Sequence, residues 1–133
     1  METGQYTEEQ KKHILIVDDD PVYATLVRSW LKDTYLADVV TSGEFVLPFV
    51  HGAKTGMPVD LILLDYDMPV MDGPRVFAML QEDPDSAGIP VIFLTGVETK
   101  EALARIMDLK PAGYLTKTAT KESILSHIRS RLE

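Results

Sequence analysis

The sequence predicts an α/β fold in which five parallel strands alternate with helices. Short apolar runs recur at regular intervals, and amphipathic stretches lie between them. Most of the runs are rich in Val, Ile or aromatic residues, as strands buried on both faces of a sheet are. Such alternation indicates βαβ units, and right-handed crossovers then place helices on both faces of a doubly wound parallel sheet. The runs are HILIV (13–17), ADVV (37–40), LILL (61–64), VIFL (91–94) and GYL (113–115).

The first amphipathic stretch, PVYATLVRSWLKD (21–33), predicts a helix that begins directly after the first strand. Asp20 suits its N-cap, and Pro21 suits the first helical position. The helical period places three large apolar residues on one face and three more beside it. These are Val22, Leu26 and Trp30, then Tyr23, Val27 and Leu31.

The remaining stretches predict further helices with the same pattern. They are GPRVFAMLQED (73–83), TKEALARIMDL (99–109) and KESILSHIRSRLE (121–133), the last with Thr120 as its cap. The stretch SGEFVLPFVHGAKTG (42–56) carries Pro48 inside it. Because an interior proline removes a hydrogen bond and kinks a helix, we expect this helix to be short, bent or displaced.

Length and composition predict one cytoplasmic domain. The 133 residues allow a single domain with a core, expected over 12–133, after a flexible tail over 1–11. No run is long enough to span a bilayer, and the N-terminus lacks the apolar part of a signal peptide. There is no cysteine, and the net charge of −8 argues against direct binding to nucleic acid.

Polar residues follow four of the predicted strands. The carboxyl ends of parallel strands share one edge of the sheet, and ligands bind there where the strand order reverses direction. In a sheet of order 2-1-3-4-5 that point lies between the first and third strands, and both of these end in aspartates. The polar residues are Asp18–Asp20, Asp65 with Asp67, Thr95, and Thr116–Lys117.

The chemistry of these side chains suits a phosphoryl group and a divalent cation. Asp18, Asp19 and Asp65 are hard oxygen ligands that repel one another, and Mg²⁺ is the cation that such ligands favour. Lys117 adds a second positive charge, and Thr95 adds a hydroxyl donor. Together they match the oxygens of a transferring phosphoryl group, with Asp65 as the nucleophile that forms an acyl phosphate.

Each residue alone also has an ordinary structural explanation. An Asp run before proline is commonly a helix N-cap, and Thr95 or Lys117 alone would be a strand-end hydroxyl and a surface lysine. Their joint occurrence at four strand ends is what favours a site. His13, His51 and His127 show no ligand spacing, and no glycine-rich phosphate loop follows any strand.

At this point the sequence resembles the receiver domain of two-component response regulators, in particular the chemotaxis-regulator-like type. The matching segments are ILIVDDDP, LILLDYDMPVMDG, IPVIFLTG and AGYLTK, and the resemblance covers about residues 12–132. It implies a flavodoxin-like (βα)5 sandwich that acts as a phospho-accepting switch in a phosphorelay. It also implies a protein that is not an enzyme, beyond assisting its own phosphorylation and autodephosphorylation.

The resemblance implies a role for each residue of the acceptor and the metal site. Asp65 matches the phosphorylated aspartate. Asp19 matches the direct ligand of Mg²⁺ (or Mn²⁺), and Asp18 matches a ligand that acts mainly through water. Asp67 matches the position whose backbone carbonyl completes the metal site, and its carboxylate here is a departure that bears on the lifetime of the phosphate.

The resemblance also implies a switch and a set of partners. Thr95 contacts the phosphoryl group and moves, Lys117 pairs with Asp65 or its phosphate, and Tyr114 turns inward as Thr95 moves. A histidine kinase or histidine phosphotransfer protein donates the group and docks on the first helix near Val22 and Tyr23. The output surface spans the fourth helix to the fifth helix, around residues 98–131, in a monomer or a phosphorylation-dependent dimer with no direct nucleic acid or membrane contact.

One further departure concerns the residue after Lys117, where the family usually has a proline that is often preceded by a cis bond. Here Thr118 follows, and a cis bond before a non-proline residue costs about 2.5–4 kcal/mol. We therefore expect a trans bond and a different loop before the last helix.

Two other functions compete with this interpretation. The Asp-Tyr-Asp of the third strand also resembles haloacid-dehalogenase-type phosphatases, but Pro69 stands where Thr or Val is normal and the motif lies mid-chain. A receiver-like interaction module that needs no phosphorylation is the other alternative, and the intact Asp65, Thr95 and Lys117 argue against it. The sequence leaves open the cognate kinase, the output partner, and whether the receiver stands alone or comes from a larger protein.

Overall fold

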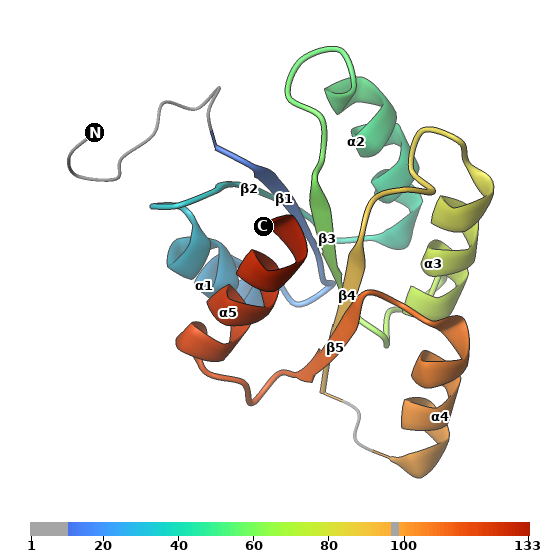
Figure 1. The fold of residues 1–133 in the computed structure, drawn as a ribbon. Coiled ribbons are helices and arrows are strands. Elements are labelled where there is room, and N and C mark those ends of the chain that lie inside the picture. Colours follow the sequence, from blue (N-terminus) through green and yellow to red (C-terminus); the bar gives the residue numbers. More distant parts are fainter. Residues whose placement is uncertain (1–10, 97–98) are drawn as a thin grey trace.

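The computed structural model describes residues 11–96 and 99–133. Five strands form one parallel sheet in the order β2-β1-β3-β4-β5 (Figure 1). This confirms the predicted α/β architecture and strand order. The strands are β1 His13–Val17, β2 Leu36–Val40, β3 Leu61–Leu64, β4 Val91–Thr95 and β5 Gly113–Thr116.

The helices cover both faces of the sheet (Figure 1). α1 and α5 lie on one face, and α2, α3 and α4 lie on the other. The side chains of each central strand alternate between two cores, because successive residues of a strand point to opposite faces. The helices are α1 Pro21–Leu31, the 3₁₀ helix η2 Gly43–Phe45, α2 Val46–Ala53, α3 Gly73–Glu82, α4 Lys100–Leu109 and α5 Lys121–Leu132.

Strand β1 illustrates this alternation. Ile14 and Ile16 belong to the core under α1 and α5, whereas Leu15 and Val17 belong to the core under α2, α3 and α4. Every residue of β1, β3 and β4 is buried, while the edge strands β2 and β5 are partly exposed. The aspartates that follow β1 and β3 are therefore carried on strands that are buried on both faces.

Helix α1 buries only part of the apolar surface that the sequence indicated, which includes Val27 and Leu31. Ala24, Val27 and Leu31 are its buried residues, whereas Val22 is 79% exposed and Leu26 is 45% exposed. The Val22–Leu26 stripe therefore faces solvent. The predicted caps of this helix and of α5 are confirmed, because Asp20 accepts from the Val22 amide and Thr120 accepts from the Ser123 amide.

Helix α2 is short, as the position of Pro48 predicted. It has eight residues and follows directly on η2. Pro48 is its third residue, within the first turn, where a backbone N–H has no partner inside the helix. The proline is therefore accommodated without the loss of a helical hydrogen bond.

The tail expected over 1–11 falls almost wholly on residues 1–10, which lie outside the described residues. Within residues 11–96 and 99–133, no helix is both long enough and apolar enough to cross a membrane.

Candidate functional site

The aspartates that follow β1 and β3 meet at the carboxyl edge of the sheet. The two strands are parallel neighbours, and the Asp65 amide donates to the Val17 carbonyl at 2.9 Å. Carboxylate oxygens from Asp18, Asp19 and Asp65 all lie within 4.8 Å of one another. The convergence predicted from the sequence is confirmed.

The turn after β3 fixes the backbone of Asp65. The Gly73 amide donates to the Tyr66 carbonyl at 2.9 Å, and Asp72 caps α3 by accepting from the Arg75 amide at 3.1 Å. A Cβ atom at Gly73 would overlap the backbone carbonyl oxygen of Asp65. The Met-Asp-Gly segment therefore serves to bring the start of α3 into close contact with the aspartate.

Lys117 reaches this cluster from the end of β5. Its Nζ lies 2.7 Å from Asp18 Oδ2 and 3.5 Å from Asp65 Oδ2. The Lys117 amide donates to the Thr95 carbonyl at 2.8 Å, which ties the lysine backbone to β4. The ammonium is thus held between two carboxylates and pairs more closely with Asp18.

The bond between Lys117 and Thr118 is trans, as expected, because no cis peptide bond occurs among residues 11–96 and 99–133. The Thr118 hydroxyl forms a hydrogen bond of 2.6 Å with the Thr116 hydroxyl. This side-chain contact bridges the two residues that flank Lys117.

Burial dominates the electrostatics of the cluster. Asp18 and Asp65 are only 3% and 4% exposed, whereas Asp19 is exposed. Burial raises the pKa of the Asp65 carboxyl to about 7, the charge of Asp18 adds to this rise, and Lys117 opposes it. Burial alone would lower the pKa of Lys117, but its hydrogen bond to Asp18 and the charge of Asp65 raise that pKa above its ordinary value.

The remaining predicted site residues lie on or beside the same sheet edge. Thr95 is the last residue of β4 and is fully buried. Tyr114 lies in β5 opposite Phe93 and packs partly buried against the core under α4. Asp67 is exposed, two residues beyond Asp65. The structure thus carries Thr95 and Tyr114 on adjacent strands, and their roles remain predictions.

One residue at the site was not assigned to it from the sequence. The ring of Tyr23 lies 4.9 Å from Lys117 Nζ, measured to the ring centroid. Its hydroxyl is buried and has no hydrogen-bond partner among the described residues. The sequence feature that could have indicated Tyr23 is its position in the first turn of the helix after β1. That position brings an aromatic ring to the same sheet edge.

The donor set fits a divalent cation of the magnesium type. It consists of carboxylate oxygens from Asp18, Asp19 and Asp65, with no sulfur and no imidazole. Mg²⁺ prefers such oxygen donors. Because one lysine faces three carboxylates, the cluster keeps negative charge that a cation can neutralise.

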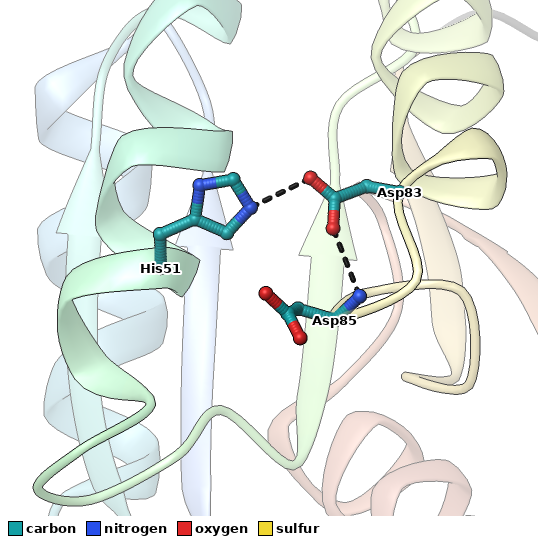
Figure 2. Close-up of side chains that lie close together, drawn as sticks. All are labelled: His51, Asp83 and Asp85. Carbon is teal, nitrogen blue, oxygen red and sulfur yellow. Dashed lines mark hydrogen bonds and ion pairs between the residues drawn. The ribbon is translucent and has the colours of Figure 1, made fainter.

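A second group of acidic residues lies far from this edge, between α2 and the loop after α3 (Figure 2). His51 Nε2 lies 2.6 Å from Asp83 Oδ2, and the Asp85 amide donates to Asp83 Oδ1 at 2.8 Å. Lys54 pairs with Asp85 at 3.1 Å. The sequence did not reveal this group, because His51 and Asp83 stand 32 positions apart.

The other histidines have structural contacts. His13 is buried, with Nδ1 2.6 Å from the Met57 carbonyl and Nε2 2.8 Å from Asp38. His127 is exposed, and its ring bonds the Ser123 carbonyl of the same helix at 2.8 Å.

Comparisons with known proteins agree with this site. The chain matches the response regulator receiver domain over residues 14–129. The chemotaxis protein CheY of Halobacterium salinarum is 29% identical, over 88% of this chain and 93% of its own. The receiver domain of a signal transduction histidine kinase from Syntrophus aciditrophicus is 30% identical, with a TM-score of 0.80 and coverage of 91% of this chain and 89% of that one.

Some relatives are much longer than this chain. A probable cyclic di-GMP phosphodiesterase of Vibrio cholerae is 32% identical over 90% of this chain, which spans only 26% of that protein. The DNA-binding regulator RpaA of Synechocystis is 33% identical, and the chain spans 48% of it. With the family match covering most of the chain, the CheY-like fold and the acidic cluster at the carboxyl edge of the sheet, this chain belongs to the response regulator receiver domains of two-component signalling.

Proposed function

We propose that this chain is a phospho-accepting switch in which Asp65 takes a phosphoryl group from a phosphohistidine. The supporting observation is the arrangement around Asp65, whose buried carboxylate lies among Asp18, Asp19 and the ammonium of Lys117. A receiver domain implies a histidine kinase as partner. A histidine phosphotransfer protein would serve as donor by the same chemistry.

The residues that would hold the cation are Asp18, Asp19 and Asp65, with the backbone carbonyl of Asp67. When bound, Mg²⁺ (or Mn²⁺) neutralises carboxylate charge and the charge on the phosphoryl oxygens. The pKa of about 7 at Asp65 means that the acceptor must lose its proton before it can attack. A bound cation favours the ionised carboxylate, because metal binding and proton loss are linked.

In the transfer, a carboxylate oxygen of Asp65 forms a bond to phosphorus as the bond from phosphorus to the donor imidazole nitrogen breaks. Lys117 is held as an ammonium by its raised pKa, so it can pair with the incoming phosphoryl oxygens. The hydroxyl of Thr95 donates to the same group. Both residues stabilise charge that develops on the transferring oxygens.

The response of the fold follows from the added charge. Phosphorylation adds negative charge and strong acceptors at Asp65, which draws Thr95 toward the group and lets Tyr114 turn inward. The event biases a pre-existing equilibrium between two arrangements. The affected surface is formed by α4, β5 and α5, where Met107 is 61% exposed and Leu103 is 37% exposed. A downstream effector or a second copy binds there.

The donor docks at the start of α1, which lies on the same face of the sheet as α5. Val22 and Leu26 form an exposed apolar stripe there, 79% and 45% exposed. In this proposal the chain assists its own phosphorylation and dephosphorylation and acts on no separate substrate.

Incubation with acetyl phosphate, with and without Mg²⁺, followed by intact mass spectrometry, tests the proposal. We expect a gain of one phosphoryl group that requires Mg²⁺, is absent in Asp65→Asn and is retained in Asp83→Asn. If no gain is seen, beryllofluoride with Mg²⁺ separates two explanations. Binding of that analogue indicates an adduct that hydrolyses quickly, whereas no binding would contradict the proposal and favour a phosphorylation-independent interaction module.

A further inference from the structure

Within residues 11–96 and 99–133, the ammonium of Lys117 lies close to two carboxylates and one aromatic ring. The carboxylates are those of Asp18 at 2.7 Å and Asp65 at 3.5 Å. The ring is that of Tyr23, whose centroid lies 4.9 Å from Lys117 Nζ. This distance is within the range in which a cation is attracted to the face of an aromatic ring.

Lys117 needs such a neighbour to have a defined position. A lysine side chain is a flexible four-carbon stem that ends in a compact charge, so its contacts decide where the ammonium rests. The carboxylates alone would draw it toward Asp18, with which it already pairs most closely. The ring of Tyr23, whose centroid lies 4.9 Å from Lys117 Nζ, adds an attraction that does not come from a carboxylate.

The hydroxyl of Tyr23 does not explain why a tyrosine stands here. Its oxygen is buried and has no hydrogen-bond partner in the part of the chain that the structure describes. A buried hydroxyl without a partner lowers stability. The ring contact with Lys117 is therefore the interaction of this side chain that bears on the site.

We propose that Tyr23 is a positioning residue for phosphoryl acceptance, with its ring holding the Lys117 ammonium between Asp18 and Asp65. This inference rests on the proposed function of Asp65. Without the ring, the ammonium is free to settle against Asp18, and Asp65 loses part of the positive charge that assists transfer. Tyr23 acts through Lys117 and does not itself contact the reacting atoms.

The test compares rates of phosphoryl gain from acetyl phosphate and Mg²⁺ in three variants. Tyr23→Leu removes the ring, Tyr23→Phe keeps it, and Trp30→Leu makes a similar aromatic loss on the same helix, against the same core. We expect Tyr23→Leu to be slower by about threefold to tenfold, the range that a partly buried cation–π contact supports. Tyr23→Phe should restore the rate, and Trp30→Leu should match the wild-type protein within about twofold.

The same Tyr23 substitution in a protein that lacks Lys117 separates a positioning role of the ring from a general loss of packing. In a Lys117→Met protein, adding Tyr23→Leu should cause no further slowing, because the ring then has no ammonium to hold. Equal slowing in both backgrounds would overturn the inference. So would a Tyr23→Leu rate equal to that of Trp30→Leu, or a Tyr23→Phe protein as slow as Tyr23→Leu.

A measurement that needs no phosphorylation tests the contact between Tyr23 and Lys117 separately from the proposed function of Asp65. In nuclear magnetic resonance spectra, the methylene protons next to the Lys117 ammonium should show an upfield ring-current shift that Tyr23→Phe keeps and Tyr23→Leu loses. That result supports the contact between the ring and the ammonium even if the wild-type protein neither gains a phosphoryl group nor binds beryllofluoride, an outcome that would refute the proposed function and, with it, the part of the ring in phosphoryl acceptance. An unchanged shift in Tyr23→Leu would overturn the inference.

Discussion

Two groups of acidic residues in this molecule have similar composition and opposite electrostatic behaviour. The cluster at the sheet edge joins Asp18, Asp19 and Asp65 to Lys117, and the pKa of Asp65 rises to about 7. The group between α2 and the loop after α3 joins Asp83 and Asp85 to His51 (Figure 2), and Lys54 pairs with Asp85. There the pKa of Asp83 falls below its ordinary value, first because the Asp85 amide donates to it and then because of His51.

The difference shows that solvent access and hydrogen bonding, rather than the count of charges, decide what a carboxylate can do. Asp65 is buried beside another carboxylate, so its ionised form is unfavourable until a cation or a phosphoryl group alters the balance. Asp83 lies near solvent and already has donors suited to its charge. The first group holds a carboxylate whose ionised form is unfavourable, and the second connects two segments of the chain.

The largest expected effect is at the glycine next to each group. Gly73→Ala places a methyl group against the backbone of Asp65, and we expect a loss of about 3 kcal/mol in the free energy of unfolding. Gly52 lies in α2 beside His51 and has open space around it. Gly52→Ala should therefore raise stability by about 0.5 kcal/mol, since alanine favours helix. Urea denaturation measures both, and equal effects would contradict the close packing at Gly73.

The next largest difference in stability between the two groups is expected when the lysine of each is replaced. Lys117→Met leaves Asp18 and Asp65 together without their counter-charge, and we expect a loss of about 2 kcal/mol at pH 8. The loss should be smaller at pH 5, where Asp65 can take up a proton. Lys54→Met removes an exposed pair and should change stability by less than about 0.5 kcal/mol. A large loss from Lys54→Met would show that the exposed group matters more than its surroundings suggest.

Neutralising one aspartate in each group should change stability in opposite directions. Asp65→Asn removes an unfavourable buried charge, and we expect a gain on the order of 1–2 kcal/mol at pH 8. Because the folded pKa lies above the unfolded one, the stabilising contribution of Asp65 is present below about pH 4 and lost as the pH rises through about 7. The gain from Asp65→Asn should therefore shrink at pH 5.

Asp83→Asn should lower stability instead. The carboxylate of Asp83 is favoured in the folded state, so its contribution is present at neutral pH and lost as the pH falls through its lowered pKa. Thermal unfolding at pH 7 and pH 3 tests the sign, and a gain from Asp83→Asn at pH 7 would contradict it.

A smaller effect concerns the affinity of the sheet-edge cluster for Mg²⁺. Below pH 7 the cation must displace a proton from Asp65, so affinity should rise by up to about tenfold per pH unit and level off above pH 7. Calorimetric titrations across this range measure it. A flat profile would show that the cation does not compete with the Asp65 proton.

Much of this arrangement was predictable from the sequence because it depends on local patterns. The apolar runs defined the strands, and the flavodoxin-like strand order implied by the resemblance to receiver domains placed the first and third strands side by side. The convergence of Asp18, Asp19 and Asp65 could therefore be predicted from the sequence. Asp20 and Thr120 were predictable as caps because capping depends on side chains close by in the sequence.

The parts that were missed depend on how the elements pack. Helical periodicity indicated six apolar residues of α1, but it did not show that Val27 and Leu31 would be buried while Val22 and Leu26 remain exposed. The contact between the Tyr23 ring and Lys117 joins residues far apart in the sequence, and so does the pairing of His51 with Asp83. No local pattern carries such information.

The most direct test of the central claim is to locate the phosphoryl group after reaction with acetyl phosphate and Mg²⁺. Sodium borohydride reduces an aspartyl phosphate to homoserine, and tandem mass spectrometry of the digested protein then identifies the position. We expect homoserine at residue 65 and unmodified aspartate at residues 18, 19 and 83. Homoserine at another aspartate, with Asp65 intact, would contradict it.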